Sequence, residues 1–463
     1  MKPAPTSQAV VVTESGVHLE LGACIGRGGQ GEVWELKGGR RAVKLLVGVP
    51  ESKRDHLRAQ LAYVRRLQDV ARTDVVKPLE LLQAPSLGYV MELVTGMVPL
   101  SALAYPPQHT PSIREWYVAA GGLKRRLRIL ARVAESLWIL HAQGLAYGDP
   151  SLSNILISKD PEQDEVRLID PDNIRAASRP GDVVYTPGFG APEVVTGRSG
   201  VSTLSDAHAF AVIAFQTLSL THPLIGDAAS AGEPELEERA LRGELPWIDC
   251  PDDQANRSSS GLPRELVLSK LLHDCFLRTF GTGLTNPENR PGLSEWASRL
   301  LGASRAVLTC PQCAATYYGL SRHTVQCPFC QAPVPERLEI HLALVRNNRG
   351  ISSESAQERI DMRVGAVLAD LDPIDITHSL LFDEIGPKGR EVVMSVKKVG
   401  SSVVLQAFAP NVTVLAPGNP QRKNLDLRPH DFPIGSTPLE VAVRQGDAGN
   451  EMRITFTRSP RRT

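Results

Sequence analysis

The sequence predicts an α+β chain in which a small β-rich lobe, a helical lobe, a short cysteine-bearing module and an all-β domain follow one another. Three observations support this order. Strand-like runs surround a glycine cluster in residues 16–95, helical periodicity dominates from about Leu123 to Gly302, and short alternating runs between Gly, Pro, Asn and Asp return after residue 336. Four of the seven cysteines form two CxxC pairs between the last two regions.

Composition narrows the class of protein. A hydrophobic content of 42% and a charged content of 22% are ordinary for a packed globular chain, and 463 residues suffice for about three domains. Because 51 Lys and Arg balance 51 Asp and Glu, nucleic acid is not an expected partner. The first residues contain no apolar core of signal-peptide length, and AFAVIAF is too short to span a bilayer. We therefore expect a cytoplasmic protein without a membrane partner.

The elements of the first lobe follow from the period of the apolar residues. Residues 1–15 form a polar, Pro-containing lead. Strands are predicted in GVHLELGACIG, GEVWEL, RRAVKLLV, DVVKPLELL and LGYVMELV, with a helix in KRDHLRAQLAYVRRL after the third strand.

The second lobe carries the period of amphipathic helices. Helices are predicted in LKRRLRILARVAESLWILHAQG, SDAHAFAVIAFQTLSL and PGLSEWASRLLG. Residues 228–261 are rich in Pro, Asp, Ser and Gly, which predicts an exposed, mobile insertion with one short helix.

A glycine-rich turn and a lysine follow one another in the first lobe. Gly26, Gly28 and Gly31 have GxGxxG spacing, and the strand that follows them favours a hairpin over a dinucleotide-binding turn, which needs a helix. Lys44 lies on an apolar strand 18 residues after Gly26. Alone, the glycines fit an ordinary hairpin and the lysine fits an edge-strand charge. Their spacing favours a site in which the backbone and the ammonium contact phosphates.

Two acidic motifs follow in the second lobe. YGDPSLSN contains Asp149 and Asn154, and LIDPD contains Asp170. A single Asp-Pro is more often a turn or a helix cap. Together, however, these residues have the spacing at which oxygen ligands hold a nucleotide's metal ions beside a catalytic carboxylate.

In this order the motifs resemble the eukaryotic-type (bacterial) Ser/Thr protein kinases. The resemblance covers about residues 16–303 and implies a bilobal protein-kinase fold with an N-lobe at 16–95 and a C-lobe at 96–303. It implies ATP and Mg²⁺ (or Mn²⁺) as cofactors and Ser/Thr hydroxyls of a protein substrate as acceptors. By the resemblance, Asp149 and Lys44 are catalytic, together with the metal-binding Asn154 and Asp170. The nucleotide would contact Gly26, Gly28, Gly31, Val33, Ala42, Lys44, Met91, Glu92, Val94 and Leu156.

Three further positions fit the same resemblance. Glu193 in TPGFGAPEV belongs to the segment that receives a substrate peptide, and Arg290 would be its buried partner. Asp206 would brace the catalytic loop.

The chain departs from the kinase pattern at several points. Tyr147 and Gly148 replace His and Arg, so control by a phosphorylated activation loop is not expected. Ser151 replaces a lysine that neutralises the γ-phosphate, and Pro171 replaces a phenylalanine and fixes the loop.

The helix after Lys44 contains no Glu to pair with this lysine, and its candidate partners are Asp55, Gln60 and Glu51. Because of these departures, a nucleotide-binding pseudokinase scaffold stays as an alternative to a protein kinase. A small-molecule kinase is a second alternative, against which the TPGFGAPEV segment argues.

The remaining chain has two parts. Cys310, Cys313, Cys327 and Cys330 lie in two CPxC pairs thirteen residues apart, which predicts a structural Zn²⁺ in residues 304–335, a motif similar to a zinc ribbon. Residues 336–463 predict a β-sandwich that recruits a substrate or partner. By analogy with bacterial stress-associated kinases, a phosphatase and a von Willebrand A-type protein are possible partners.

Overall fold

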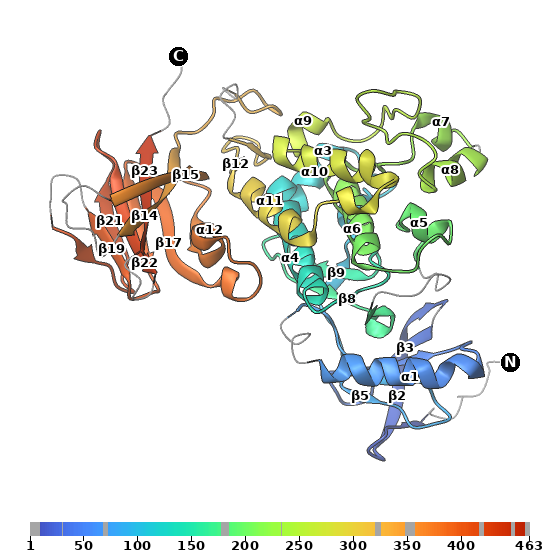
Figure 1. The fold of residues 1–463 in the computed structure, drawn as a ribbon. Helices are drawn as coiled ribbons and strands as arrows, with labels where there is room; N and C mark the ends of the chain where they lie inside the picture. The colour runs from blue at the N-terminus through green and yellow to red at the C-terminus, as the bar shows by residue number, and fades with distance from the viewer. Residues whose placement is uncertain are drawn as a thin grey trace. The chain divides into compact units, whose positions relative to one another are not determined.

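The computed structural model describes residues 10–29, 31–67, 73–176, 185–232, 234–319, 326–347, 357–415, 421–445 and 450–458. The described parts of Met1–Tyr105, Arg132–Ser260 and Cys275–Leu293 form one compact unit, and those of Pro106–Ala131, Gly261–Asp274 and Ser294–Thr463 form a second. The sequence placed a boundary at residue 303, whereas the second unit also holds helical segments from before that residue. Figure 1 shows the chain coloured from its N-terminus in blue to its C-terminus in red.

The first lobe is an antiparallel sheet with one long helix. The strand order is β1-β2-β3-β4-β6-β5, and helix α1 (Glu51–Arg66) contacts β5. The strands are β1 (Val10–Val12), β2 (His18–Gly28), β3 (Gly31–Leu36), β4 (Arg41–Leu46), β5 (Glu80–Leu81) and β6 (Gly88–Glu92). Residues Val10–Val12 fell within the lead in the sequence analysis. Here they pair with β2, since three β-branched residues suit an edge strand.

The helical lobe is organised around a buried helix. All residues of α6 (Thr203–Ser219) from Ser205 onward are buried, and Ser202 and Ser205 form a capping box at its start. The helices besides α6 are α2 (Ser101–Ala104), α3 (Ile113–Ala119), α4 (Gly122–His141), α5 (Pro192–Val195), α7 (Asp227–Ser230), α8 (Pro234–Leu241), α9 (Arg264–Val267), α10 (Lys270–Phe280), α11 (Leu293–Arg305) and the 3₁₀ turns η2 (Pro171–Asn173), η3 (Thr282–Leu284) and η4 (Pro287–Asn289).

Short strands in the same lobe hold the loops that carry the acidic motifs. One small sheet has the order β10-β9-β7, and a second pairs β11 with β8. These strands are β7 (Met97–Pro99), β8 (Leu145–Ala146), β9 (Ile155–Ser158), β10 (Val166–Leu168) and β11 (Arg175–Ala176).

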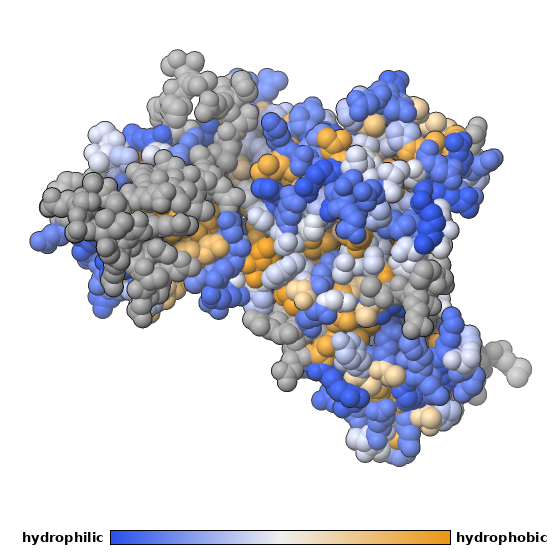
Figure 2. Space-filling view, in the orientation of Figure 1, coloured by the Kyte–Doolittle hydropathy of each residue, from blue (hydrophilic) through white to orange (hydrophobic). Residues whose placement is uncertain are grey.

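Residues 228–261 are more ordered than the sequence predicted. Two helical segments, α7 and α8, occur where one was expected, and Figure 2 shows a mainly hydrophilic surface where α8 lies. Beyond α8, however, Trp247 is fully buried and meets Phe215 and Phe280 edge-on or tilted. The buried Asn256 donates to the carbonyls of Leu224 and Pro246. The prediction of an exposed insertion is therefore wrong for this part, because an indole ring anchors it in the core.

The all-β region at the end of the chain consists of two antiparallel sheets. Their strand orders are β15-β14-β23-β22-β19-β20 and β16-β17-β18-β21, and one apolar core takes residues from both. The elements are β14 (Leu338–Asn347), β15 (Gln357–Leu368), β16 (Ile374–Thr377), α12 (His378–Phe382), η5 (Lys388–Arg390), β17 (Val392–Val399), β18 (Ser402–Ala407), β19 (Val412–Leu415), β20 (Lys423–Asn424), β21 (His430–Pro433), β22 (Leu439–Gln445) and β23 (Asn450–Arg458).

Buried Asp372 ties together three segments of the second unit. Its carboxylate accepts hydrogen bonds from the Lys124 ammonium at 2.9 Å and from the backbone and hydroxyl of Thr309 at 2.9 and 2.8 Å. Thr309 ends strand β12 (Val307–Thr309), which pairs with β13 (Thr316–Tyr318). In the part of the chain that the structure describes, no helix is both long and apolar enough to cross a membrane.

Candidate functional site

Lys44 lies at the centre of a buried charge cluster. Its ammonium is 3.0 Å from Asp170 Oδ1 and 2.9 Å from Asp172 Oδ1, and its side chain is only 3% exposed. Strand β4 places it opposite Tyr89 of β6, whose hydroxyl also donates to Asp172 Oδ1. Burial opposes the charged form of Lys44, but Asp172 and then Asp170 outweigh it and raise the pKa of the ammonium.

The helix partner that the sequence suggested for Lys44 is wrong. Asp55 and Glu51 are exposed on α1, and Glu51 pairs with Arg54. Gln60 is partly buried, but its amide donates to the backbone carbonyls of Asp172 and Ile174 at 2.7 and 2.9 Å. The carboxylates that contact Lys44 come instead from the segment around η2. Sequence analysis did not consider Asp172, which stands where the kinase family has a glycine, as a partner of Lys44. The signal that could have found this partner was the second acid of LIDPD.

Asp149 and Asn154 lie together on the loop between β8 and β9. The Asn154 amide donates to the backbone carbonyl of Asp149 at 3.0 Å and to its carboxylate at 3.4 Å. Thr186, which the sequence analysis did not single out, donates its N–H and hydroxyl to the two carboxylate oxygens at 2.6 and 3.0 Å. Burial raises the pKa of the Asp149 carboxyl above its usual value, although these donors oppose the shift.

The same loop is connected to Asp170 and to α6. The backbone N–H of Ile169 donates to the Asn154 carbonyl at 2.9 Å, which fixes Asp170 beside the loop. Burial raises the pKa of the Asp170 carboxyl, and the neighbouring Lys44 opposes this shift. Asp206 of α6 accepts the N–H groups of Tyr147 and Gly148 at 2.6 and 3.0 Å.

Three of the departures from the kinase pattern have structural explanations. Tyr147 is buried, and its hydroxyl donates to the Ile169 carbonyl. Gly148 has a φ of +97°, and a Cβ there would lie 2.5 Å from the carbonyl oxygen of Asn173, so this position excludes a side chain. Ser151 is buried, and its hydroxyl accepts the N–H of Asn154 at 3.3 Å.

The residues expected to contact a nucleobase lie partly together. Ala42 and Met91 belong to one buried apolar cluster, and Val33 and Val94 pack against it. Glu92 is exposed opposite Arg41, so only its backbone faces β4. Leu156 lies on β9 opposite Arg167 and is not a member of this cluster.

The glycine-rich turn joins β2 and β3. Gly28 pairs with Gly31, and Gly26 pairs with Val33. A Cβ at Gly31 would meet the Leu45 carbonyl at 2.2 Å, so this glycine is needed for the close approach of β3 to β4.

The segment after Thr186 is held by buried polar contacts. Arg290 forms two parallel bonds to Glu193, at 2.7 and 2.8 Å, and its guanidinium is fully buried. His222 donates from Nε2 to the Gly188 carbonyl and accepts the Leu224 N–H at Nδ1, and burial lowers the pKa of its imidazole to about 4. This neutral histidine and the ion pair fix the shape of the TPGFGAPEV segment.

The four cysteines of the CxxC pairs converge in the second unit. Their sulfur atoms all lie within 4.8 Å of one another, with Cys310 and Cys330 3.6 Å apart. The two turns have the same geometry, since Ala314 and Gln331 follow them with positive φ and donate to the carbonyls of Cys310 and Cys327. Tetrahedral Zn²⁺ with Zn–S bonds of about 2.3 Å places sulfur atoms about 3.8 Å apart, so the donor set fits this ion.

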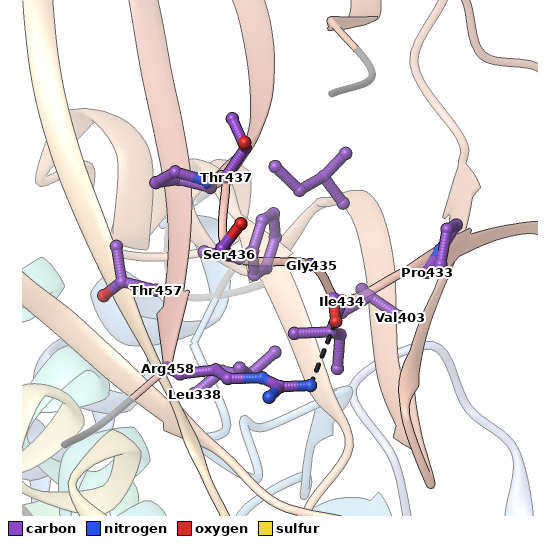
Figure 3. A pocket seen from close by; sticks show the side chains of 12 residues that line it. Leu338, Val403, Pro433, Ile434, Gly435, Ser436, Thr437, Thr457 and Arg458 are labelled. Atoms are coloured by element: carbon purple, nitrogen blue, oxygen red, sulfur yellow. Dashed lines mark hydrogen bonds between the residues drawn. The ribbon is translucent and has the colours of Figure 1, made fainter. Parts of the chain in front are cut away.

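A cavity opens in the all-β region between the two sheets. Its volume is about 270 Å³, and Figure 3 shows Arg458 reaching across it to donate to the carbonyl of Ile434. Leu338, Val403 and Phe456 give it apolar walls, while polar groups come from residues 435–437 and 457–458. A mixed lining of this kind is typical of small binding pockets.

Comparison with known proteins adds a family match. Residues 19–277, more than half of the chain, match the family described as "Protein kinase domain". Similar proteins include Serine/threonine-protein kinase pkn2 of Myxococcus xanthus, 33% identical over 110 residues that make up 22% of this chain and 13% of that protein. CBL-interacting protein kinase 4 of Oryza sativa subsp. japonica is 29% identical over 255 residues, 50% of this chain and 51% of that protein.

A third similar protein is Dual serine/threonine and tyrosine protein kinase of Homo sapiens, 35% identical over 126 residues, which are 27% of this chain and 12% of that protein. The chain thus spans about half or less of the length of these relatives.

Proposed function

Since the chain belongs to the protein kinase family, we propose that it transfers the γ-phosphoryl group of ATP to Ser and Thr hydroxyls of protein substrates. The observation that carries this proposal is the contact of Lys44 with Asp170 beside the loop of Asp149 and Asn154. These are the groups that bind phosphate, metal and hydroxyl in phosphoryl transfer. The name of the Myxococcus xanthus relative agrees with transfer to Ser and Thr, whereas the name of the Homo sapiens relative also includes tyrosine.

The residues of the site fit a metal-bound nucleotide. The Asn154 amide nitrogen faces Asp149, which leaves its carbonyl oxygen for a cation, and the partly exposed Asp170 offers a carboxylate. ATP with Mg²⁺ (or Mn²⁺) supplies the transferred group. Lys44 would then contact the phosphates, while Val33, Ala42, Met91 and Val94 would form the apolar wall beside the base.

Asp149 would orient the acceptor hydroxyl and take its proton. Its carboxylate is held by Thr186, at the start of the segment that we expect to receive a peptide. Because Arg290 and His222 fix this segment, an extended polypeptide is a better substrate for the site than a sugar or an aminoglycoside.

Substitution of Asp149 tests the proposed activity. We expect Asp149→Asn to lower transfer of radiolabelled phosphate by at least about 100-fold, because the amide cannot accept the proton of the hydroxyl. The matched control is Asp160→Asn, an exposed aspartate outside the site, which should keep wild-type activity.

Other outcomes of this assay would favour the alternatives. Equal incorporation by wild type and Asp149→Asn would refute the proposed catalytic site. ATP binding without any transfer would favour a pseudokinase scaffold. Transfer to a small molecule but to no protein side chain would favour a small-molecule kinase.

The cysteine module is proposed to hold one structural Zn²⁺. Four Cys ligands leave no open coordination position, so this ion would stabilise the fold of a zinc ribbon and would not take part in the reaction. The sulfur distances support this proposal, since a disulfide needs sulfur atoms about 2.0 Å apart. Reduced thiols also fit a cytoplasmic location.

The all-β region is proposed to recruit protein substrates or partners, and its cavity supports this role. A tryptophan in place of the exposed Ser436 would fill the cavity. We expect Ser436→Trp to raise KM for a recruited protein substrate at least about threefold, without changing kcat on a short peptide. Asn424→Trp, on β20 outside the cavity, is the control. An unchanged KM would contradict recruitment through the cavity.

A phosphatase and a von Willebrand A-type protein are candidate partners for capture on this region.

A further inference from the structure

The position of Lys44 is controlled by residues outside helix α1. In the described part of α1 no carboxylate contacts this lysine, and the amide of Gln60 is bound to two backbone carbonyls of the segment around η2. Helix α1 therefore supports the backbone of that segment, while the segment itself supplies the charges that hold the ammonium.

Asp172 is built into this segment as a fixed carboxylate. It is 5% exposed, and the same oxygen, Oδ1, accepts from Lys44 at 2.9 Å and from Tyr89 at 3.0 Å. Tyr89 is fully buried on β6, directly opposite Lys44 in the sheet register. Two neighbouring strands thus hold one carboxylate oxygen, and Pro171 restricts the backbone just before it.

The second carboxylate on Lys44 has another task. Asp170 also contacts the ammonium, but under the proposed function its carboxylate would hold the metal ion of the nucleotide. Asp172 is more deeply buried than Asp170, whose side chain is 26% exposed, and Tyr89 already holds it. Asp172 can therefore keep its bond to Lys44 when the nucleotide is present.

We propose that Asp172 is the positioning residue for Lys44 and replaces the missing carboxylate of helix α1. The inference rests on the proposed function, in which Lys44 contacts the phosphates of ATP. Because the partner lies two residues after Asp170, an outward movement of α1 alone would not break the ion pair. The position of Lys44 is thereby linked to the turn whose Asp170 would hold the metal ion.

The Asp172→Asn variant tests this role because it keeps the shape of the side chain and removes its charge. We expect kcat to fall by up to about 100-fold, which is the cost that a displacement of about 1 Å in a catalytic group can have. KM for ATP should stay the same or fall, because an anion near the phosphates has been removed. Tyr89→Phe removes only the hydroxyl that orients Asp172. It should also lower kcat, but by a smaller factor than Asp172→Asn does.

A matched control separates positioning from general loss of a buried ion pair. Asp372→Asn breaks another buried Asp–Lys contact of 2.9 Å, to Lys124, far along the chain from the site residues. This variant is expected to lower thermal stability and to leave kcat within twofold of wild type. An equal fall of kcat in Asp372→Asn and Asp172→Asn would overturn the positioning role.

A second readout does not need phosphoryl transfer. The rate at which an adenosine-linked sulfonyl fluoride modifies Lys44 is measured against pH, and the midpoint should move to lower pH in Asp172→Asn, since the ammonium loses an anionic neighbour. If the wild type transfers no phosphate but the pH midpoint of Lys44 modification shifts in Asp172→Asn, the proposed function is refuted and the Lys44–Asp172 pair is supported. If the wild type is active, and both kcat and this pH midpoint are unchanged in Asp172→Asn and in Tyr89→Phe, the inference is overturned.

Discussion

Removal of the proposed Zn²⁺ by a chelator is expected to unfold the cysteine module. We expect the purified chain to contain about one Zn²⁺, and its removal to expose residues 307–318 and 326–334 to proteolysis. The apparent binding free energy of structural zinc in isolated fingers is about 10–16 kcal/mol, which far exceeds what such a short segment obtains from apolar burial. The measurements are elemental analysis, followed by limited proteolysis and thermal unfolding with and without chelator.

The local packing explains why the effect should concentrate in this module. Two of the four cysteines are buried in a small apolar cluster with Leu308 and Tyr317. Val367 and Ala369 of the all-β region belong to the same cluster. Without the metal, the four thiols would lose the bonds that hold the two turns together. The cluster is too small to replace them, so the loss should spread to the pair of strands β12 and β13.

Two cysteine substitutions provide the controlled comparison. Cys327→Ser is expected to lose most of the zinc, because one of four thiolate ligands is gone. Cys250→Ser changes a cysteine outside the cluster and should keep one Zn²⁺ per chain. Zinc-free wild-type protein whose unfolding is unaffected by chelator would contradict the proposed site.

Much of the candidate site could be predicted because its residues are tied to short, local patterns. Asp149 and Asn154 are five residues apart on one loop, and their hydrogen bond forms within that loop. The two CxxC turns are likewise complete within four residues each, so their spacing alone indicates a metal site. Patterns of this kind need no knowledge of how distant segments meet.

The partner of Lys44 could not be predicted in the same way. Lys44 and Asp172 are separated by 128 positions, and only the fold brings them to 2.9 Å. In the sequence, Asp172 is read only as a residue that replaces a glycine, and the absence of a Glu from α1 is read as a missing ion pair with Lys44. In the structure, the carboxylate of Asp172 in the turn supplies the negative charge that α1 lacks.

The packing of side chains and the pairing of distant strands could not be predicted from local sequence patterns either. Trp247 lies in a stretch whose composition predicts exposure, yet its indole is buried against aromatic side chains of α6 and α10. Strand β14 pairs with β23, more than 100 residues later, so its place in a sheet depends on a distant partner. A prediction from composition averages over many neighbouring residues, and it therefore misses one large buried side chain such as Trp247.

Arg290→Ala is expected to be the most destabilising single substitution near the site. The guanidinium is fully buried, binds both oxygens of Glu193, and donates to the carbonyls of Gly283 and Leu204 at 2.9 Å each. Its removal leaves a mostly buried carboxylate without a counter-charge and two carbonyls without donors. Loss of one partner of such a pair costs about 3–5 kcal/mol in the free energy of unfolding, which urea unfolding measures.

An exposed pair of the same chemistry gives the control. Arg242 and Glu238 are four residues apart on and just after α8, with side chains 42% and 60% exposed, so Arg242→Ala should cost at most about 0.5 kcal/mol. Combining Arg290→Met with Glu193→Gln removes both charges and should recover part of the loss seen in Arg290→Ala. A cost for Arg290→Ala no larger than that of Arg242→Ala would show that the pair does not stabilise the TPGFGAPEV segment. The expected difference arises because water screens the exposed pair strongly, whereas the Arg290 guanidinium is fully buried and only 13% of the Glu193 side chain is exposed.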